Sequence, residues 1–234
     1  MNQKHVFLES EANCWFLRNK DHISHFDPNK DAICSILSGI LSPKSTIAEV
    51  GCASGNRLAH LAQLYGATSF GIEPSSLAVQ EAKEQHPELN IRSGTADCLP
   101  WESKSIDCLI YGFCLYLADR DDLFRIAAEG DRVLKSGGFL VVWDFCPPFP
   151  YRNLYSHRTG INSFKMDYSL LWKWSPSYTE IIRQLSSHST APSEAQVIAK
   201  PDDRVVTVVL HKETHYDYPD TPVYPAQNEI APSE

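Results

Sequence analysis

Residues 46–145 alternate between short apolar segments and amphipathic segments, and this alternation restricts the possible folds more than any other feature of the chain. The apolar segments of strand length are 46–50, 68–72, 89–93, 105–113 and 139–145. The segments with apolar residues at helical spacing are 57–65, 75–86 and 121–134. Because 105–113 is almost entirely apolar, it suits a strand that is covered on both faces. The pattern predicts a parallel, doubly wound α/β sheet.

The remaining segments are less regular. An aromatic segment at 14–20 precedes an expected helix at 30–37, a second helix is expected at 177–185, and a late strand at 204–212. We expect one domain over 1–212, followed by an acidic, proline-rich tail at 213–234 that is disordered or loosely draped. Within the domain we distinguish N-terminal lid helices (1–45), a cofactor-binding core (46–145), a substrate-side insertion and helix (146–203) and the last strand (204–212). Residues 146–175 are rich in Pro, Tyr and Trp, so we expect this part to be an ordered insertion.

Composition and charge argue against several classes of function. The net charge of −8 comes with no cluster of lysine or arginine, which argues against a nucleic-acid partner. No apolar run approaches the ~20 residues of a membrane helix, and the N-terminus lacks the pattern of a secretory signal. The cysteines are scattered without the Cys-x-x-Cys spacing of a zinc site. We therefore expect a cytoplasmic protein with reduced cysteines, no metal and no membrane contact.

The loop after the first strand contains the most informative glycines, in "IAEVGCASGNRLAH" (47–60). A dinucleotide fingerprint from Gly51 requires glycine at two positions where Ala53 and Asn56 stand. An acid-x-Gly-x-Gly-x-Gly pattern is matched by Glu49, Gly51 and Gly55, with Ala53 as one conservative departure. A pyrophosphate needs a bare helix N-terminus, whereas a ligand with an amino-acid moiety needs an acid to meet its ammonium. The loop favours the second kind of ligand.

Two further acids follow strands at the same expected edge of the sheet. Glu73 ends the second strand, where a carboxylate can accept both hydroxyls of a ribose, although dinucleotide enzymes place an acid similarly. Asp97 follows the third strand, where it can hold an adenine amino group. These positions indicate a nucleoside ligand.

Four segments together resemble class I S-adenosylmethionine-dependent methyltransferases in order and spacing. They are "EVGCASGNRL", "GIEPS", "GTADCLPWESKSIDCLIYGFCLYLAD" and "VLKSGGFLVVWDF". The resemblance covers roughly 45–145 and the late strand, and the "WFLRNKDHI" and "SFKMDYSLLWKWSPSY" segments resemble uncharacterised bacterial methyltransferases of surface-glycan or sugar pathways. It implies a Rossmann-like doubly wound seven-stranded sheet with one antiparallel strand, a helical N-terminal lid and an insertion after the fifth strand.

The resemblance also implies which residues hold the methionine part of S-adenosylmethionine, whose product is S-adenosylhomocysteine. Glu49 and Gly51 lie against the methionine amino group. Cys52, Ala53 and Gly55 belong to the loop that wraps the methionine and the ribose. The methyl group of Ala53 narrows this loop relative to the family's glycine.

The nucleoside side follows in the same way. The resemblance assigns Glu73 to the ribose hydroxyls and Pro74 to a position beside the adenine. Ala96 and Asp97 contact the adenine. Phe113 begins the segment beside the methyl-bearing sulfonium.

Aromatic residues outside the core suggest a cover for this site. Near the N-terminus, Phe16 and Arg18 are expected to form a lid with Trp15, with Arg18 meeting the cofactor carboxylate; the alternative is an ordinary amphipathic helix face. Trp172 and Trp174 fit a buried core better than a platform for stacking sugars.

Methyl transfer from a sulfonium needs a positioned acceptor and exclusion of water, and a base only where the acceptor loses a proton. The candidate catalytic residues are Tyr116 after the fourth strand, Asp144 at the end of the fifth, and His157 in the insertion as the best base. Lys165 and Tyr168 are candidate substrate contacts. The alternatives are a packing role for Tyr116, a turn cap for Asp144 and a surface position for His157.

We therefore expect an S-adenosylmethionine-dependent methyltransferase that acts on a polar small molecule, at oxygen of a sugar, sugar nucleotide or related metabolite. The expected partner is this acceptor and not a nucleic acid, and the protein is a monomer or homodimer. Two alternatives stay open. One is a protein or nucleic-acid methyltransferase that docks its substrate on 146–175, and the other is a non-catalytic relative that binds S-adenosylmethionine.

Overall fold

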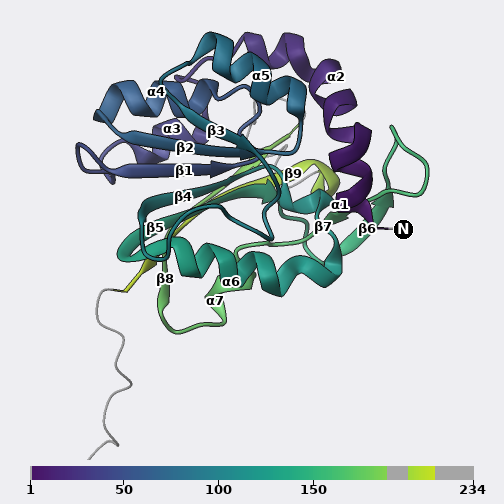
Figure 1. The fold of residues 1–234 in the computed structure, drawn as a ribbon. Helices are drawn as coiled ribbons and strands as arrows, with labels where there is room; N and C mark the ends of the chain where they lie inside the picture. The colour runs from purple at the N-terminus through teal and green to yellow at the C-terminus, as the bar shows by residue number, and fades with distance from the viewer. Residues whose placement is uncertain (1, 189–199, 214–234) are drawn as a thin grey trace, which may run out of the picture.

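The computed structural model describes residues 2–188 and 200–213, and Figure 1 shows helices on both faces of a central sheet. Its strands lie in the order β3-β2-β1-β4-β5-β9-β8. They are β1 (Thr46–Val50), β2 (Thr68–Glu73), β3 (Asn90–Ser93), β4 (Ile106–Gly112), β5 (Leu134–Phe145), β8 (Tyr178–Ser187) and β9 (Arg204–Lys212). β1 to β5 run parallel, and β9 is antiparallel to both of its neighbours. The predicted seven-stranded sheet with one antiparallel strand is confirmed.

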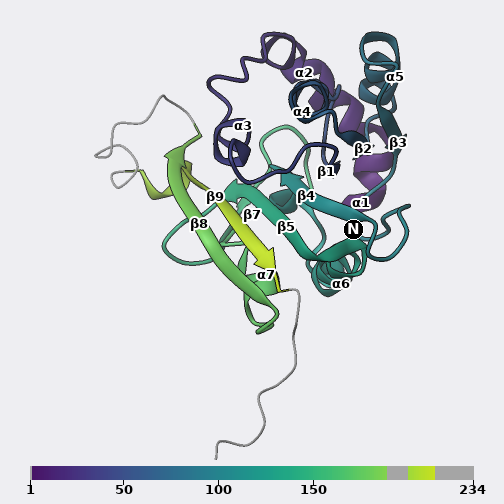
Figure 2. The same ribbon diagram turned by 90° about the vertical axis from the view of Figure 1, so that its left-hand side faces the viewer.

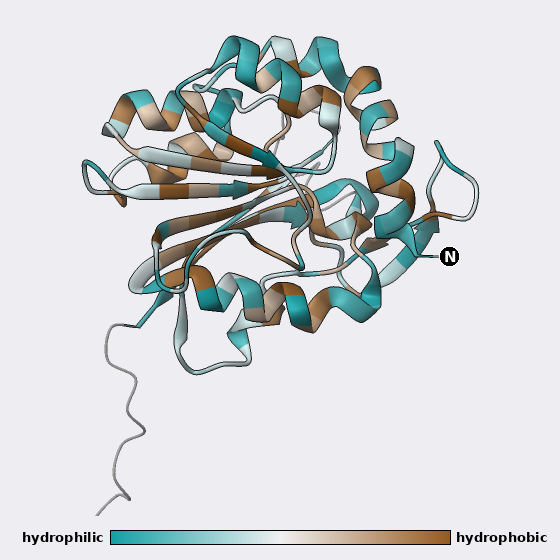
Figure 3. Cartoon of the chain, viewed as in Figure 1, coloured by the Kyte–Doolittle hydropathy of each residue, from teal (hydrophilic) through white to brown (hydrophobic). Residues whose placement is uncertain are grey.

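Helices cover each face of the sheet, as Figure 2 shows. One face carries α3 (Ala32–Leu37), α4 (Asn56–Tyr65) and α5 (Ser76–Gln85), and the other α6 (Leu123–Val133) and α7 (Leu170–Lys173). Because alternate residues of a strand face opposite ways, Ile47 packs with the first set and Ala48 with the second. Figure 3 shows the most hydrophobic residues on the strands, between two layers of amphipathic helices.

The predicted helix at 177–185 is wrong, because this segment forms the edge strand β8. The spacing of Ile181, Ile182 and Leu185 is compatible with a helix, and on the open edge of the sheet the strand buries few of its side chains. A bulge between Glu180 and Ile182 also breaks the two-residue alternation that would identify a strand. Pairing along the whole of β9 determines the conformation instead.

The N-terminal residues form consecutive helical segments beside the carboxyl ends of the parallel strands (Figure 1). They are α1 (Gln3–Val6), the π-helical turn η1 (Phe7–Glu11) and α2 (Ala12–Ser24). The Gln3 amide nitrogen Nε2 donates to the carbonyl oxygens of Leu117 and Asn162, at 3.0 and 3.1 Å. The backbone N–H groups of Gln3 and Lys4 donate to Asp119. These bonds attach the N-terminal helix to the loop after β4 and, through Asn162, to the insertion after β5.

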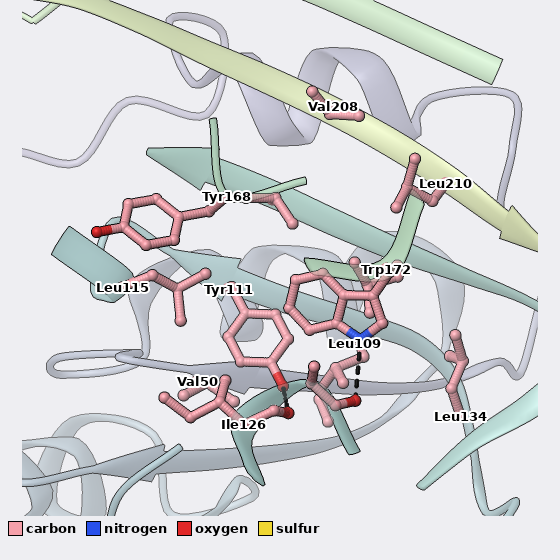
Figure 4. Close-up of a cluster of buried hydrophobic side chains, with 14 of the residues drawn as sticks. Val50, Leu109, Tyr111, Leu115, Ile126, Leu134, Tyr168, Trp172, Val208 and Leu210 are labelled. Atoms are coloured by element: carbon pink, nitrogen blue, oxygen red, sulfur yellow. Dashed lines mark hydrogen bonds between the residues drawn. The ribbon is translucent and has the colours of Figure 1, made fainter. Parts of the chain in front are cut away.

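The described part of the insertion after β5 contains a hairpin of β6 (Tyr151–Leu154) and β7 (Asn162–Lys165). Trp172 is buried under α6, its ring lies 5.1 Å from that of Tyr111, and its Nε1 donates to the Ala127 carbonyl (Figure 4). The core position predicted for Trp174 is wrong. This side chain is 75 % exposed, because the indole nitrogen caps the end of α7 by donating to the Leu171 carbonyl.

Short 3-10 turns complete the described chain: η2 (Leu115–Leu117), η3 (Arg120–Asp122) and η4 (Pro201–Asp203). All seven cysteines are unpaired. Within residues 2–188 and 200–213, no helix is both long and apolar enough to cross a membrane. The tail predicted for 213–234 lies outside the described residues except for Glu213.

Candidate functional site

The glycine loop joins β1 to α4 at the carboxyl edge of the sheet. Gly51 has a left-handed φ of 77°, and its N–H donates to the Ile72 carbonyl at 2.9 Å. A Cβ at this position would lie 2.8 Å from Cys114 Cβ, so only glycine lets the segment after β4 pass so closely. Gly55, with φ 82°, begins α4, while Cys52 points into the core beneath the loop. The loop is thus fixed at both ends.

Ala53 takes the conformation of the glycine that it replaces. Its φ is 47°, a left-handed value that costs a residue with a side chain about 1–2 kcal/mol. The Ala53 N–H donates to Glu73 Oε2 at 3.0 Å, and the Ser75 N–H donates to Oε1 at 2.9 Å. Burial raises the pKa of Glu73 to about 7, against the effect of these two N–H donors. Each Glu73 oxygen keeps a further lone pair for a hydroxyl donor.

Glu49 forms a buried ion pair that the sequence patterns did not indicate. Its Oε1 binds the Arg57 guanidinium, which also contacts both oxygens of Asp31 at 2.8 to 3.2 Å. Glu49 is 1 % exposed, and its Oε2 has no hydrogen-bond partner among the described residues. The site therefore holds a carboxylate oxygen that is buried and free to accept.

The two carboxylates around Arg57 differ in their pKa shifts. Burial raises the pKa of Glu49, and the pairing of one oxygen with Arg57 does not offset it. Burial acts on Asp31 as well, but two-point contact with Arg57 and the Cys34 N–H hold the pKa of Asp31 below its usual value. Arg57 alone therefore does not fully stabilise the negative charge of Glu49, and a second cationic group near Oε2 would stabilise it further.

Asp97 lies after β3, under the N-terminal helix. Lys4 Nζ lies 2.6 Å from Asp97 Oδ2 and 2.8 Å from Asp122, and Thr95 Oγ1 donates to Asp97 Oδ1 at 2.7 Å. Although burial opposes the shift, these contacts hold the pKa of Asp97 below its usual value. The carboxylate that the resemblance assigns to adenine is ion-paired with Lys4 in this structure.

The expected lid lies on the loops of the site. Asn13 of α2 accepts a hydrogen bond from Ser75 Oγ at 2.8 Å, at the start of α5. Phe16 is almost fully buried, facing inward. The Arg18 guanidinium forms an ion pair with Glu11 at 2.6 Å, so in this structure it binds a residue of the N-terminal helical segments. Of the nucleoside residues, Pro74 joins β2 to α5, and Ala96 packs at the margin of the α6-side core.

Five rings form an aromatic cluster beside the loop after β4. Phe113 is its centre, with ring centroids 4.8 to 5.1 Å from those of Tyr116, Trp143, Phe145 and His188. Phe113 has φ 58°, a left-handed value that a side chain disfavours. Backbone strain of this kind concentrates at functional sites.

Asp144 and Tyr116 support this cluster from within the fold. The Asp144 carboxylate accepts the N–H groups of Leu115, Tyr116 and Phe145 at 2.7 to 3.2 Å, and burial raises its pKa to about 7. Tyr116 is buried, and this burial raises the pKa of its hydroxyl. Both predicted catalytic residues therefore shape the loop after β4.

The predicted residues of the insertion lie apart from one another. His157 is exposed in the loop between β6 and β7, with its ring edge-on to Tyr155, and Figure 1 shows this loop projecting from the body. Lys165 is ion-paired with Asp202 at 2.8 Å and lies 3.9 Å from the Phe145 ring centre, which brings it to the aromatic cluster. Tyr168 is fully buried and packs the core.

Residues 48–142 match the family model described as methyltransferase domain. Among curated relatives, a demethylmenaquinone methyltransferase of Chlorobaculum tepidum is 31% identical over 104 residues, 44% of this chain and 40% of that protein. An uncharacterized methyltransferase of Synechocystis is 29% identical over 116 residues, 46% of this chain and 54% of that protein. The chain thus spans about half the length of the curated relatives that it matches.

Solved structures share the fold over more of the chain. A methyltransferase of Methanosarcina mazei has a TM-score of 0.60 and 18% identity, covering 77% of this chain and 98% of that chain. The 1,6-didemethyltoxoflavin-N1-methyltransferase of Burkholderia thailandensis, with bound 1,6-didemethyltoxoflavin and S-adenosylhomocysteine, has a TM-score of 0.67 and 14% identity, covering 89% and 88%.

Proposed function

Residues 48–142 are a methyltransferase domain with the fold of class I S-adenosylmethionine-dependent methyltransferases, and from this premise we propose that the chain is an active enzyme of that kind. It transfers the methyl group of S-adenosylmethionine to a small-molecule acceptor. We further propose that it acts in the cytoplasm, as a monomer or homodimer.

The buried, unpartnered Oε2 of Glu49 is the observation that best supports this cofactor. A buried carboxylate oxygen without a partner is costly, and an ammonium donor removes that cost. S-adenosylmethionine carries an ammonium group for Glu49, ribose hydroxyls for Glu73 and an adenine amino group for Asp97. These donors match the three carboxylates of the site, so the residues present fit the cofactor.

When bound, S-adenosylmethionine supplies a methyl group on a positively charged sulfur. The chain has the remaining tasks of binding, orientation and exclusion of water. Gly51 and Ala53 shape the loop around the ligand, while Glu73 is fixed by two N–H donors before any hydroxyl arrives. To accept the adenine amino group, Asp97 must give up part of its contact with Lys4. Because Lys4 belongs to α1, cofactor binding should change how α1 is held.

The aromatic cluster favours an acceptor that contains a ring. Both the apolar face of a sugar and a flat ring stack on such side chains. We propose transfer to oxygen of a sugar, a sugar nucleotide or a related ring metabolite. Methylation at a ring carbon or nitrogen is the second candidate. It is suggested by a relative and a structural neighbour that are named for menaquinone and toxoflavin, which are ring compounds. A net charge of −8 without a basic stripe supports a small molecule over a nucleic acid.

Calorimetry of the full chain tests the cofactor. S-adenosylmethionine and S-adenosylhomocysteine are expected to bind, and NAD is not. Glu49→Gln should weaken S-adenosylmethionine about 10- to 100-fold, because a hydrogen bond to a charged group is worth roughly 1.5–3 kcal/mol. Exposed Glu84→Gln on α5 is the matched control, with no change expected. Binding of NAD without S-adenosylmethionine would refute the proposal.

A second experiment tests the acceptor class. Methyl-labelled S-adenosylmethionine is incubated with the chain and with fractionated small molecules, total protein or RNA. Label is expected in a small-molecule fraction. Greater transfer to protein or RNA would favour a macromolecular acceptor, and no transfer despite tight binding would favour a non-catalytic role.

A further inference from the structure

A histidine that none of the sequence patterns indicated lies at the aromatic cluster. His188 directly follows β8, and its N–H donates to the Asp203 carbonyl at 2.8 Å. Since β8 and β5 are both antiparallel to β9, β8 runs parallel to β5. The end of β8 therefore reaches the same carboxyl edge of the sheet as the glycine loop.

Contacts with two aromatic rings fix the place of this imidazole. It stacks on Phe113 with centroids 4.9 Å apart and an interplanar angle of 11°, and lies 5.4 Å from Phe145. Phe113 itself has a left-handed backbone with φ 58°, and its N–H donates to the Trp143 carbonyl at 2.8 Å. The imidazole thus rests on Phe113, which begins the segment that the resemblance places beside the methyl-bearing sulfonium.

The groups around His188 lower the pKa of its imidazole. His188 stands at an exposed position, and partial desolvation of the imidazole against the rings lowers its pKa below 6.5; Lys165 from β7 and, when protonated, His22 from α2 act in the same direction. Asp203 of η4 opposes them, while Asp202 is engaged with Lys165. A neutral imidazole has a nitrogen lone pair that accepts a proton.

We propose that His188, and not His157, is the base that receives the proton of the acceptor hydroxyl, an inference that rests on the proposed function. The acceptor oxygen forms a bond to the methyl carbon, and the carbon–sulfur bond breaks with its electron pair left on sulfur. The hydroxyl proton passes to the imidazole of His188, which releases it to water. The acceptor is thus a ring compound with a hydroxyl group.

The first test needs no acceptor. Long-range proton–nitrogen spectra of the ¹⁵N-labelled full chain report each imidazole, and His188→Asn and His157→Asn assign the two signals. Saturation with S-adenosylhomocysteine is expected to shift the His188 signals and to leave those of His157 in place. Unmoved His188 signals, with calorimetry showing that S-adenosylhomocysteine is bound, would overturn the proposal.

The second test measures label transfer to the small-molecule fraction that the wild type methylates. His188→Asn should lower the rate about 10²- to 10³-fold, with S-adenosylmethionine affinity unchanged. The wild-type rate should fall as the pH drops through the pKa of His188, and this fall should be absent in the variant. His157→Asn, the control, should keep both rate and profile.

The outcomes separate the two proposals. If His188→Asn keeps the rate and the fall at low pH, the inference about the base is wrong and the proposed function stands. If the wild type binds no S-adenosylmethionine, or binds it and transfers no label, the proposed function itself fails, and the inference with it.

Discussion

Replacing Arg57 tests the charge arrangement beneath the glycine loop. Arg57→Met removes the only cation that contacts both Glu49 and Asp31 in the described part of the chain, and leaves two buried carboxylates unpaired. Removing one partner of a buried ion pair costs about 3–5 kcal/mol. For a chain of this size, each kcal/mol lowers the melting temperature by roughly 2–4 °C. We expect a loss of roughly 6–20 °C.

Thermal unfolding followed by circular dichroism measures the loss in melting temperature, and urea unfolding measures the corresponding loss in unfolding free energy. In the variant both carboxylates gain a raised pKa, so they become neutral more readily as the pH falls, and the deficit should be larger near pH 7.5 than near pH 4.5. Adding Glu49→Gln and Asp31→Asn should restore part of the stability, because no charge is then left unpaired. The matched control is Arg92→Met at an exposed position of β3, with a change of at most about 0.5 kcal/mol. A deficit below about 1 kcal/mol, or one independent of pH, would refute this reasoning.

Three further predictions concern the lid, the core and the loop after β4. Lys4→Met should speed amide exchange over residues 3–24, because it removes the contacts to Asp97 and Asp122; exchange measured by mass spectrometry should be unchanged in an exposed Lys83→Met control. Gly130→Ala should destabilise the chain by about 1–3 kcal/mol in urea unfolding, because the new Cβ would lie 2.6 Å from the Tyr111 hydroxyl. The folded pKa of Asp144 is about 7, above its unfolded value of about 3.9, so its contribution is present in full below the unfolded pKa and is lost as the pH rises through 7. Wild-type unfolding free energy should therefore fall between pH 5 and pH 8, and it should fall less in Asp144→Asn; equal slopes would contradict this assignment.

The predictable part of the fold is the part whose signal is local. Among the parallel strands, β1, β4 and β5 lie inside the sheet and are largely buried, so each contains a short apolar run, whereas β3 at the edge buries only Ile91. β8 has no such signal, because its conformation depends on backbone pairing with β9 and few of its side chains are buried. β5 also begins at Leu134, five residues before the expected start, since Lys135 and the two glycines continue in the strand.

The site divides in the same way. Glu49, Glu73 and Asp97 were identifiable because each stands at or just after the end of a strand, where ligands of parallel sheets bind. Arg57 and Lys4 were not, because Arg57 also pairs with Asp31, 26 residues away in the sequence, and Lys4 pairs with Asp97, 93 residues away. His188 follows a strand that was itself predicted as a helix. Errors in an element thus become errors in the site that depends on it.

Ala53 shows how a departure from a family pattern can leave the site intact. The glycine expected there would adopt a left-handed φ freely, and Ala53 adopts it at 47° despite its side chain. The compensating contact is the N–H of Ala53, which donates to the carboxylate of Glu73. This bond is made by the backbone N–H, so the methyl group of Ala53 takes no part in it. The residue that departs from the pattern is therefore also the one that ties the glycine loop to the acid proposed for the ribose.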